Sequence, residues 1–278
     1  MNNRIPFWAQ LARTAALAMS YCSRRSDDRY SLHRYRGGRI YLPLGDSHRM
    51  REKLYGTYEF WKTRLVERIV HEGMTILDVG ANVGYYTLLT ARLVGPTGRV
   101  LAFEPHPEVL HWLSRSVNAN GYDNVELFSC ALSDASGTVE FYPGRHSGWG
   151  STLFHPESAN QRLKPFAVEA RTLDDVLNGL GVDRVDLIKV DVEGTEAKVL
   201  AGARRTLRDL SPMMLVDVDL RDRKAVARIH GLLADAGYDC YAIDRGLTPL
   251  NEVPPNLKDI FAARSRSPHT PERTSQAI

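Results

Sequence analysis

Apolar and polar residues alternate in blocks along the chain, and the lengths of the blocks predict short strands separated by helices. Apolar runs with the length of buried strands begin at residue 75 and recur between segments of helical periodicity. The predicted strands are 75–79, 99–103, 125–128, 166–171, 185–190, 213–218 and, as the final strand, 238–243, with 137–142 as an extra strand. The predicted helices are 55–70, 85–94, 108–120, 195–207 and 222–236, with a further helix opened by Thr172.

This order of elements predicts one α/β domain. Strands that alternate with helices at this spacing form a doubly wound, mostly parallel sheet, here of seven strands, with helices on both faces. Such a sheet binds its ligands beyond the carboxyl ends of the strands, where the strand order reverses. The alternation breaks between 143 and 164, a polar stretch with glycine and serine. We therefore expect an insertion on the substrate side at about 137–170.

Composition divides the chain into three parts. With 278 residues, 43% of them hydrophobic and 25% charged, the chain has enough apolar residues for one large domain with extensions. We expect a basic leader at 1–50, the domain at 51–263 and a disordered tail at 264–278, which is rich in serine, proline, threonine and arginine.

Charge is distributed unevenly, and this argues against a nucleic-acid partner. Residues 1–39 hold eight arginines against Asp27 and Asp28, and residues 264–278 hold three arginines against Glu272. Removing these ends, at +6 and +2, from the total of +3 leaves −5 for the middle of the chain. A nucleic-acid groove needs clustered lysine and arginine on the folded part, so no nucleic acid is expected as a partner.

The leader contains an apolar segment that is too short to span a membrane. No apolar run in the chain approaches the roughly 20 residues that cross a bilayer. Phe7, Leu11, Ala15, Ala18 and Cys22 lie at helical spacing and predict a short amphipathic helix that packs on its own domain, with weak contact to a membrane surface as the alternative. The three cysteines form no CxxC pair, which fits a reducing compartment, and a cytoplasmic location is expected.

The main chemical signal is ILDVGANVG, residues 76–84, in which an apolar strand runs into a glycine-containing turn and then a helix. Gly80 and Gly84 let the backbone turn sharply and leave room for a ligand against it. Asp78 at the strand end suits a cationic ligand, such as a sulfonium with its amino group, better than a pyrophosphate. The residues predicted to bind the cofactor in this turn are Asp78, Gly80, Ala81, Asn82 and Gly84.

A second strand ends at Phe103-Glu104-Pro105, and Glu104 lies 24 residues after Gly80. A carboxylate there can accept hydrogen bonds from both ribose hydroxyls of an adenosine group. Pro105 follows it, and the turn around Ala131, after the third strand, is expected to pass beside the adenine. These residues indicate an adenosine-containing cofactor without distinguishing among such cofactors.

Further acidic residues follow the strand at 185–190. Asp191 and Glu193 precede the next helix, and carboxylates there can accept a proton from, or orient, an acceptor hydroxyl. Both are predicted to be catalytic, with helix capping as the alternative for Glu193. Asp217, at the end of the next strand, is predicted to bind the acceptor. With Asp191 and Asp219 it offers oxygen ligands to a divalent ion as a further alternative, although no metal ligand is assigned.

The insertion supplies two more candidates for contacts with the acceptor. Trp149 lies within GRHSGWGSTLF and offers an aromatic platform to a sugar or macrocycle, with packing in a lid as the alternative. His146 lies in the same stretch and is also predicted to contact the substrate, with a surface position as the alternative. The acceptor is expected to be a small molecule or a glycan.

Together these motifs resemble the successive blocks of the FkbM family of methyltransferases. The blocks are DVGANVGYYT, AFEPHPE, NVELFSCALSD, TLDDVL and KVDVEGTEAKVLAGA, and the resemblance covers about residues 55–220. It implies a class I, Rossmann-like methyltransferase fold, S-adenosylmethionine as the cofactor, and methyl transfer, usually to a hydroxyl of a sugar or natural product. The resemblance puts these residues on the cofactor positions: Asp78, Gly80, Asn82, Gly84 and Glu104. It puts Asp191 and Glu193 on the block after the fourth strand, and the chain departs from the family in having Asp217 where members commonly have glutamate.

The sequence therefore predicts an S-adenosylmethionine-dependent O-methyltransferase, with two alternatives. An NAD-dependent oxidoreductase has the same strand–helix–strand unit and the same acidic contact to ribose. The turn DxGxNxG lacks the strict GxGxxG spacing, which disfavours that alternative. A non-catalytic binding module on the same fold would bind the cofactor without transferring its methyl group.

Overall fold

The structure, a computed structural model, describes residues 30–43, 58–144, 150–154, 164–218, 222–250 and 257–264. Its helices are α3 (Phe60–Ile69), α4 (Tyr85–Val94), α5 (Pro107–Asn120), α6 (Leu173–Leu180), α7 (Glu196–Ala201), the π-helix η2 (Thr206–Leu210) and α8 (Arg223–Asp235). Its strands are β1 (Tyr30–Tyr35), β2 (Gly38–Pro43), β3 (Thr75–Val79), β4 (Arg99–Phe103), β5 (Val125–Phe128), β6 (Ala131–Leu132), β7 (Gly137–Pro143), β8 (Gly150–Ser151), β9 (Phe166–Arg171), β10 (Leu187–Val190), β11 (Met213–Asp217), β12 (Asp239–Ile243), β13 (Leu247–Pro249) and β14 (Asp259–Ala263).

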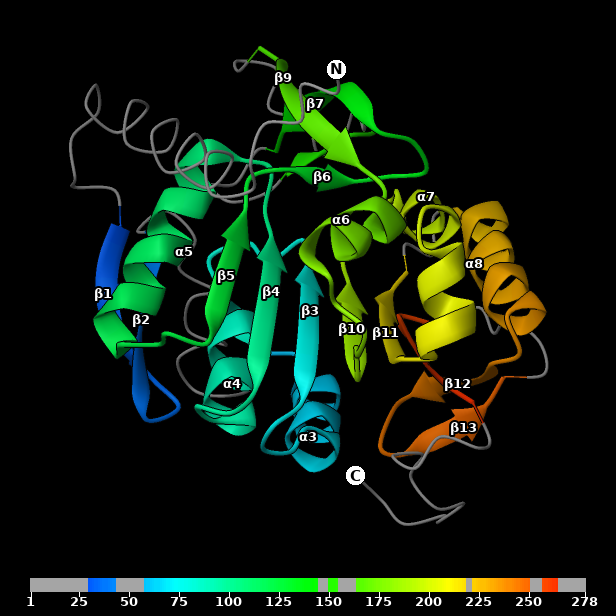
Figure 1. The fold of residues 1–278 in the computed structure, drawn as a ribbon, viewed down its shortest axis with the longest axis horizontal. Coiled ribbons are helices and arrows are strands. Elements are labelled where there is room, and N and C mark those ends of the chain that lie inside the picture. Colours follow the sequence, from blue (N-terminus) through cyan, green and yellow to red (C-terminus); the bar gives the residue numbers. More distant parts are fainter. Residues whose placement is uncertain are drawn as a thin grey trace.

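The central sheet has the strand order β13-β12-β14-β11-β10-β3-β4-β5. Strands β3, β4, β5, β10 and β11 run parallel, whereas β12, β13 and β14 pair antiparallel with their neighbours. The chain places β4 and β5 outward from β3 and then returns to place β10 on the other side of β3 (Figure 1). The predicted doubly wound, mostly parallel sheet is confirmed, with eight strands rather than seven because β13 extends one edge.

Alternating side chains along the strands build an apolar layer on each face of the sheet. In β3, Ile76 packs in one core cluster, whereas Leu77 and Val79 pack in the other. Helices α3, α4 and α5 cover the first face, and α6, α7 and α8 cover the second. Because Asp78 and Lys189 alternate with residues of the second layer, they lie on the first face, beneath α4.

Most of the predicted elements match the structure. The strands at 75–79, 99–103, 125–128 and 166–171 and the helix at 85–94 have the predicted bounds. Thr172 caps α6 as predicted, since its side chain accepts a hydrogen bond from the backbone N–H of Asp175. The remaining predicted strands and helices shift by only a few residues at their ends, with the exceptions described next.

The helix predicted at 195–207 is interrupted. It consists of α7 followed by the π-helix η2, and Gly202 ends α7. A Cβ at Gly202 would lie 2.0 Å from the backbone oxygen of Ser133. The close approach of these two backbones explains the glycine, and it is a long-range contact that periodicity along the sequence does not reveal.

The prediction that 238–243 is the final strand is wrong. β14 follows it and inserts between β11 and β12, antiparallel to both. Its central residues Ile260, Phe261 and Ala262 are fully buried. A short, continuous apolar run has no period of its own, so the alternation that revealed the other strands did not reveal this one.

Residues 30–43, which fall in the predicted basic leader, form the β1–β2 hairpin beside α5 (Figure 1). Tyr30 stacks on Trp112 of α5 with ring centroids 4.5 Å apart. The side chain of Asn120 accepts a hydrogen bond from the N–H of Arg39 and donates one to its carbonyl oxygen. The hairpin therefore packs on the domain, so part of the predicted leader belongs to the folded body.

The predicted insertion supplies β7, β8 and β9 of a second, smaller sheet, which has the order β6-β9-β7-β8 and whose strand β6 precedes the insertion. This sheet lies above the carboxyl ends of β3, β4 and β5 (Figure 1). Phe141 and Phe166 pack together inside it, with ring centroids 5.4 Å apart. The insertion is thus placed at the end of the central sheet where ligands of doubly wound folds bind.

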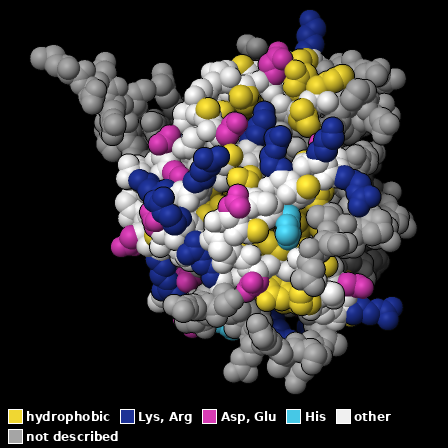
Figure 2. Space-filling view, turned by 90° about the vertical axis from the view of Figure 1, so that its right-hand side faces the viewer, with side chains coloured by type: hydrophobic (Ala, Val, Ile, Leu, Met, Phe, Trp, Pro, Cys, Tyr) yellow, Lys and Arg dark blue, Asp and Glu magenta, His cyan; other side chains and the backbone are white. Residues whose placement is uncertain are grey.

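The predicted amphipathic helix at 7–22 and the tail from residue 265 lie outside the described residues. Within the described part of the chain, none of the helices combines the length and hydropathy of a membrane span. On the face shown in Figure 2, lysine and arginine side chains are interspersed with aspartate and glutamate rather than forming one continuous basic surface.

Candidate active site

A pocket lies beyond the carboxyl ends of β3, β4 and β10, where the strand order reverses. Its walls come from the turns after these strands, from the segment around β6 and from the β7–β8 arm of the insertion. Eight residues predicted from the sequence line it: Gly80, Ala81, Asn82, Glu104, Pro105, Ala131, Asp191 and Glu193. The structure thus brings together four segments that are far apart in the chain.

Gly80 forms the sharp turn at the end of β3 and has no room for a side chain. Its φ of +75° is a left-handed conformation that favours glycine. A Cβ here would lie 1.8 Å from the backbone oxygen of Asp191. The N–H groups of Gly80 and Ala81 both donate to the carbonyl oxygen of Phe103 at 3.0 Å. The turn is therefore fixed between β4 and the end of β10.

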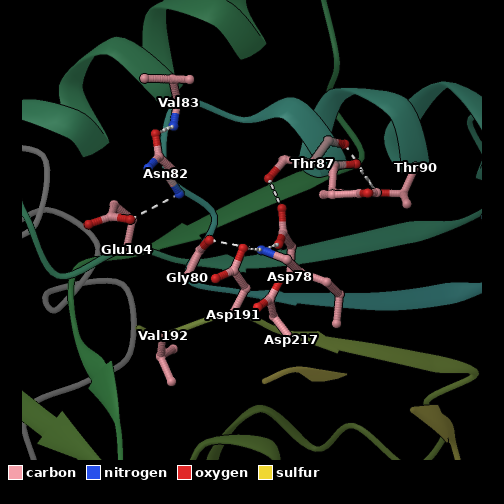
Figure 3. A network of polar contacts seen from close by, with 12 residues as sticks. Asp78, Gly80, Asn82, Val83, Thr87, Thr90, Glu104, Asp191, Val192 and Asp217 are labelled. Atoms are coloured by element: carbon pink, nitrogen blue, oxygen red, sulfur yellow. Dashed lines mark hydrogen bonds and ion pairs between the residues drawn. The ribbon is translucent and has the colours of Figure 1, made fainter. Parts of the chain in front are cut away.

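The two later positions of the turn have different roles. Asn82 has φ +52°, and its N–H donates to Glu104 while its side-chain oxygen accepts from the N–H of Val83 (Figure 3). Gly84 does not line the pocket, so its contact with the cofactor stays a prediction. A Cβ at Gly84 would lie 2.5 Å from Leu113, so this glycine allows α4 to pack against α5.

Glu104 is held by two backbone groups at the end of β4 and is 6% exposed. Its Oε2 accepts a hydrogen bond from the N–H of Asn82 at 2.9 Å, and its Oε1 accepts one from the N–H of His106 at 2.8 Å. Each oxygen keeps a second lone pair that can accept a hydrogen bond from a hydroxyl. Burial raises the pKa of Glu104 to about 7, although the two N–H groups favour the charged form.

This pKa predicts that cofactor affinity depends on pH near neutrality. Protonation removes a hydrogen-bond acceptor from Glu104, so we expect the affinity for S-adenosylhomocysteine to fall about tenfold from pH 8 to pH 6. Titration calorimetry at both pH values measures the change. Glu104→Gln should bind weakly at both values, and a wild-type affinity that is the same at pH 6 and pH 8 would contradict the role of Glu104.

Asp78 lies behind the pocket wall rather than in it, so its direct contact with the cofactor stays a prediction. It is 1% exposed and does not line the pocket. Its Oδ2 accepts a hydrogen bond from Thr87 at 2.6 Å (Figure 3). Its Oδ1 lies 3.2 Å from Nζ of Lys189. The alternation of side chains in β3 turns Asp78 under α4, so it supports the turn from below.

Lys189 lines the pocket and was not predicted from the sequence. Its Nζ donates to the carbonyl oxygen of Gly80 at 3.0 Å, and it lies 3.5 Å from a carboxylate oxygen of Asp191. Burial disfavours its charge, but Asp78 and Asp191 raise the pKa of Lys189 above the usual value, so the ammonium stays charged. The missed signal was a lysine inside the apolar strand LIKV, because a buried charge requires partners.

Asp191 and Asp217 lie close together, and Glu59 joins them in a cluster of carboxylates. One oxygen from each lies within 4.8 Å of the others, and Figure 3 shows the Asp191 and Asp217 side chains next to each other. Lys62 of α3 is 3% exposed, and its Nζ lies 2.8 Å from both Glu59 and Asp217 and 2.6 Å from Asp259. Burial and the charge of Asp191 raise the pKa of Asp217 despite its ion pair with Lys62.

The divalent ion considered as an alternative would compete with Lys62 for these carboxylates, and it stays a prediction. A calcium or magnesium ion needs carboxylate oxygens at about 2.0–2.6 Å, and here the ammonium of Lys62 already holds Glu59 and Asp217. Asp219, the third carboxylate considered, lies outside the described residues. Asp217 itself does not line the pocket, so its contact with the acceptor stays a prediction.

Glu196, rather than Glu193, holds the turn after β10. Its Oε1 accepts hydrogen bonds from the N–H groups of Val192 at 3.1 Å and Gly194 at 3.0 Å. Glu193 has φ +56° and an exposed side chain that lines the pocket. The N-cap of α7 is Thr195, so the alternative in which Glu193 caps this helix does not apply.

Apolar residues form another part of the pocket wall. Ala131 lies between Cys130 and Leu132, and all three are buried and line the pocket. Burial raises the pKa of the Cys130 thiol to about 12, so it is neutral at physiological pH. A wall of this kind fits the flat, apolar faces of an adenine ring.

The insertion closes one side of the pocket. Ser151 in β8 donates a hydrogen bond to the backbone oxygen of Glu193 at 2.8 Å. This contact joins the small sheet to the turn that carries Asp191. Trp149 and His146 lie outside the described residues, so their contact with the acceptor stays a prediction.

Known proteins with similar sequences include methyltransferases, two of which are named for methylation at an oxygen. The chain is 32% identical over 202 residues to Methyltransferase 1 of Beauveria bassiana, covering 66% of this chain and 77% of that one. It is 31% identical over 144 residues to the 2-O-methyltransferase NoeI of Sinorhizobium fredii, covering 48% and 58%. It is 30% identical over 202 residues to the 31-O-demethyl-FK506 methyltransferase FkbM of Streptomyces tacrolimicus, covering 60% and 75%.

A match to one protein family covers more than half of the chain. Residues 78–240 match the Methyltransferase FkbM domain. This region contains the glycine turn, Glu104 and Asp191, which the fold gathers around one pocket. The chain therefore belongs to the FkbM family of S-adenosylmethionine-dependent methyltransferases.

Proposed function

We propose that this methyltransferase transfers the methyl group of S-adenosylmethionine to a hydroxyl oxygen of a sugar, glycan or natural product. The observation that carries the proposal is the position of Asp191, a carboxylate on the pocket wall whose backbone touches the turn at Gly80. A carboxylate in this place can orient an acceptor hydroxyl and accept its proton.

The names of two relatives support an oxygen acceptor. The NoeI protein is named a 2-O-methyltransferase, and the FkbM protein is named for methylation of 31-O-demethyl-FK506. The NAD-dependent oxidoreductase gains no support, because the family is one of methyltransferases. The non-catalytic binding module gains none either, because the pocket carries carboxylates that such a module would not require.

The residues of the pocket fit S-adenosylmethionine. The turn at Gly80 provides a backbone surface that a Cβ would block, and Glu104 offers two anchored oxygens to the ribose hydroxyls. The bound cofactor supplies an electrophilic methyl group. The buried segment around Ala131 is proposed to contact the adenine, and Pro105 is proposed to lie beside the ribose.

On the acceptor side, the protein acts mainly by alignment and by excluding water. Asp191 is proposed to hold the acceptor hydroxyl and to take its proton late in the reaction, with Glu193 at the exposed rim as a second carboxylate. Three residues are proposed to contact the rest of the acceptor: Trp149, His146 and Asp217.

The acceptor can be identified by methyl labelling. The enzyme is incubated with methyl-labelled S-adenosylmethionine and with glycan and small-molecule fractions of a cell extract, and labelled products are characterised by mass spectrometry. We expect the label on an oxygen of a hydroxylated product that is absent from reactions without enzyme. A label on nitrogen or carbon would contradict the proposal.

Titration calorimetry with S-adenosylhomocysteine and with NAD tests the cofactor separately. We expect S-adenosylhomocysteine to bind more tightly than NAD. Tighter binding of NAD would overturn the proposed function, and binding of S-adenosylhomocysteine without any labelled product would favour the non-catalytic binding module.

A further inference from the structure

We propose that Lys189 is a positioning residue of the cofactor pocket: its ammonium fixes the peptide after Gly80 and sets the position of Asp191 relative to it. The inference rests on the proposed function, because it takes the pocket to be the site of S-adenosylmethionine. Lys189 would act through these two neighbours rather than through the reacting atoms.

Lys189 joins the two turns that form the floor of the pocket. Its Nζ donates to the carbonyl oxygen of Gly80 at 3.0 Å, in the turn after β3. The same Nζ lies 3.5 Å from Oδ2 of Asp191, in the turn after β10. One charged group thus contacts the backbone that is proposed to face the cofactor and the carboxylate that is proposed to face the acceptor.

The two turns pack so closely that a movement of one displaces the other. The space beside Gly80 is so narrow that a Cβ there would lie 1.8 Å from the backbone oxygen of Asp191. A rotation of the Gly80 peptide would therefore displace Asp191. The hydrogen bond from a charged donor opposes such a rotation, and donors of this kind give the stronger hydrogen bonds in proteins.

The lysine is itself rigidly placed. It pairs with Asp78 in the register of β10 and β3, and its Nζ lies 3.2 Å from Oδ1 of that residue. It also lies over the ring of Tyr86, 5.6 Å from the centroid. With 6% of its surface exposed, the side chain has little freedom to leave these partners.

A simpler role for Lys189 is to neutralise the buried charge of Asp78. The two roles differ in one respect. If Lys189 only balances the charge of Asp78, a variant that lacks both charges should bind S-adenosylhomocysteine as wild type does. If Lys189 positions Gly80 and Asp191, that variant should still bind S-adenosylhomocysteine more weakly than wild type.

The test is the double variant Asp78→Asn with Lys189→Met, compared with wild type and with Asp78→Asn alone. Replacing both members of a buried ion pair by neutral groups is often close to neutral for stability, so we expect the double variant to fold. Thermal unfolding checks the fold, and calorimetry with S-adenosylhomocysteine measures affinity well below the unfolding temperature.

We expect the folded double variant to bind S-adenosylhomocysteine about tenfold or more weakly than wild type, because it lacks the charged donor to Gly80. Asp78→Asn, which keeps this donor, should lose much less affinity. With an acceptor found by labelling, the KM for S-adenosylmethionine should rise in the double variant, a change that loss of stability alone would not produce.

Wild-type affinity in the double variant would overturn the proposal and leave Lys189 with the role of charge balance. If the double variant does not fold, Asp78→Asn with Lys189→Gln provides the same comparison with a polar side chain in the space, and failure of both to fold would contradict a positioning role. Failure of wild type to bind S-adenosylhomocysteine would instead overturn the proposed function itself.

Discussion

Replacing Gly80 by alanine is expected to abolish cofactor binding. The new Cβ would lie 1.8 Å from the backbone oxygen of Asp191, and its φ of +75° is strained for alanine. Backbone cannot yield as the end of a flexible side chain does, so the turn and the end of β10 must move apart. We expect the affinity for S-adenosylhomocysteine to fall about 100-fold or more, and the free energy of unfolding to fall by about 2 kcal/mol or more.

Gly121→Ala is a matched control for this substitution. Gly121 ends α5 with φ +64°, but a Cβ there would meet nothing within 4 Å. It should cost about 1–2 kcal/mol for the left-handed conformation and leave cofactor affinity unchanged. Equal loss of affinity in the two variants would mean that Gly80 acts through global stability and not through the pocket.

Replacing Asp191 by asparagine is expected to depress turnover about 100-fold, the scale of a lost acid–base group, and to leave cofactor affinity nearly intact. The asparagine side chain has almost the same shape but does not accept a proton. Steady-state kinetics with the acceptor found by labelling measure the turnover number, and calorimetry with S-adenosylhomocysteine measures affinity.

Asp183→Asn is the control for Asp191→Asn. Asp183 is exposed and precedes β10, at the opposite end of the strand from Asp191, and it does not line the pocket. Its substitution should leave both turnover and affinity unchanged. Full activity of Asp191→Asn on the labelled acceptor would show that Asp191 has no catalytic role.

The sequence predicted the location of the pocket because its key residues follow strand ends. Gly80, Glu104 and Asp191 each come after an apolar run, and the carboxyl ends of parallel strands meet at one edge of a sheet. Such features can be recognised in a single sequence, because a glycine turn or a carboxylate at a strand end is identified from its neighbours along the chain.

The sequence did not predict which of the motif residues face the pocket. Asp78 and Gly84 belong to the same motif as Gly80, but Asp78 turns under α4 and Gly84 packs against α5. Lys62 was missed for a related reason. Its partners Glu59, Asp217 and Asp259 come from three segments, and only the folded sheet places them together.

The central sheet also limits how far the chain can be truncated. The family match ends at residue 240, yet β14 at Asp259–Ala263 is hydrogen-bonded to both β11 and β12 inside the sheet. A fragment cut to the matched region would leave β11 as an open edge, and open edges recruit strands from other molecules. In the described structure β14 therefore covers the edge of β11, although none of its residues lines the pocket.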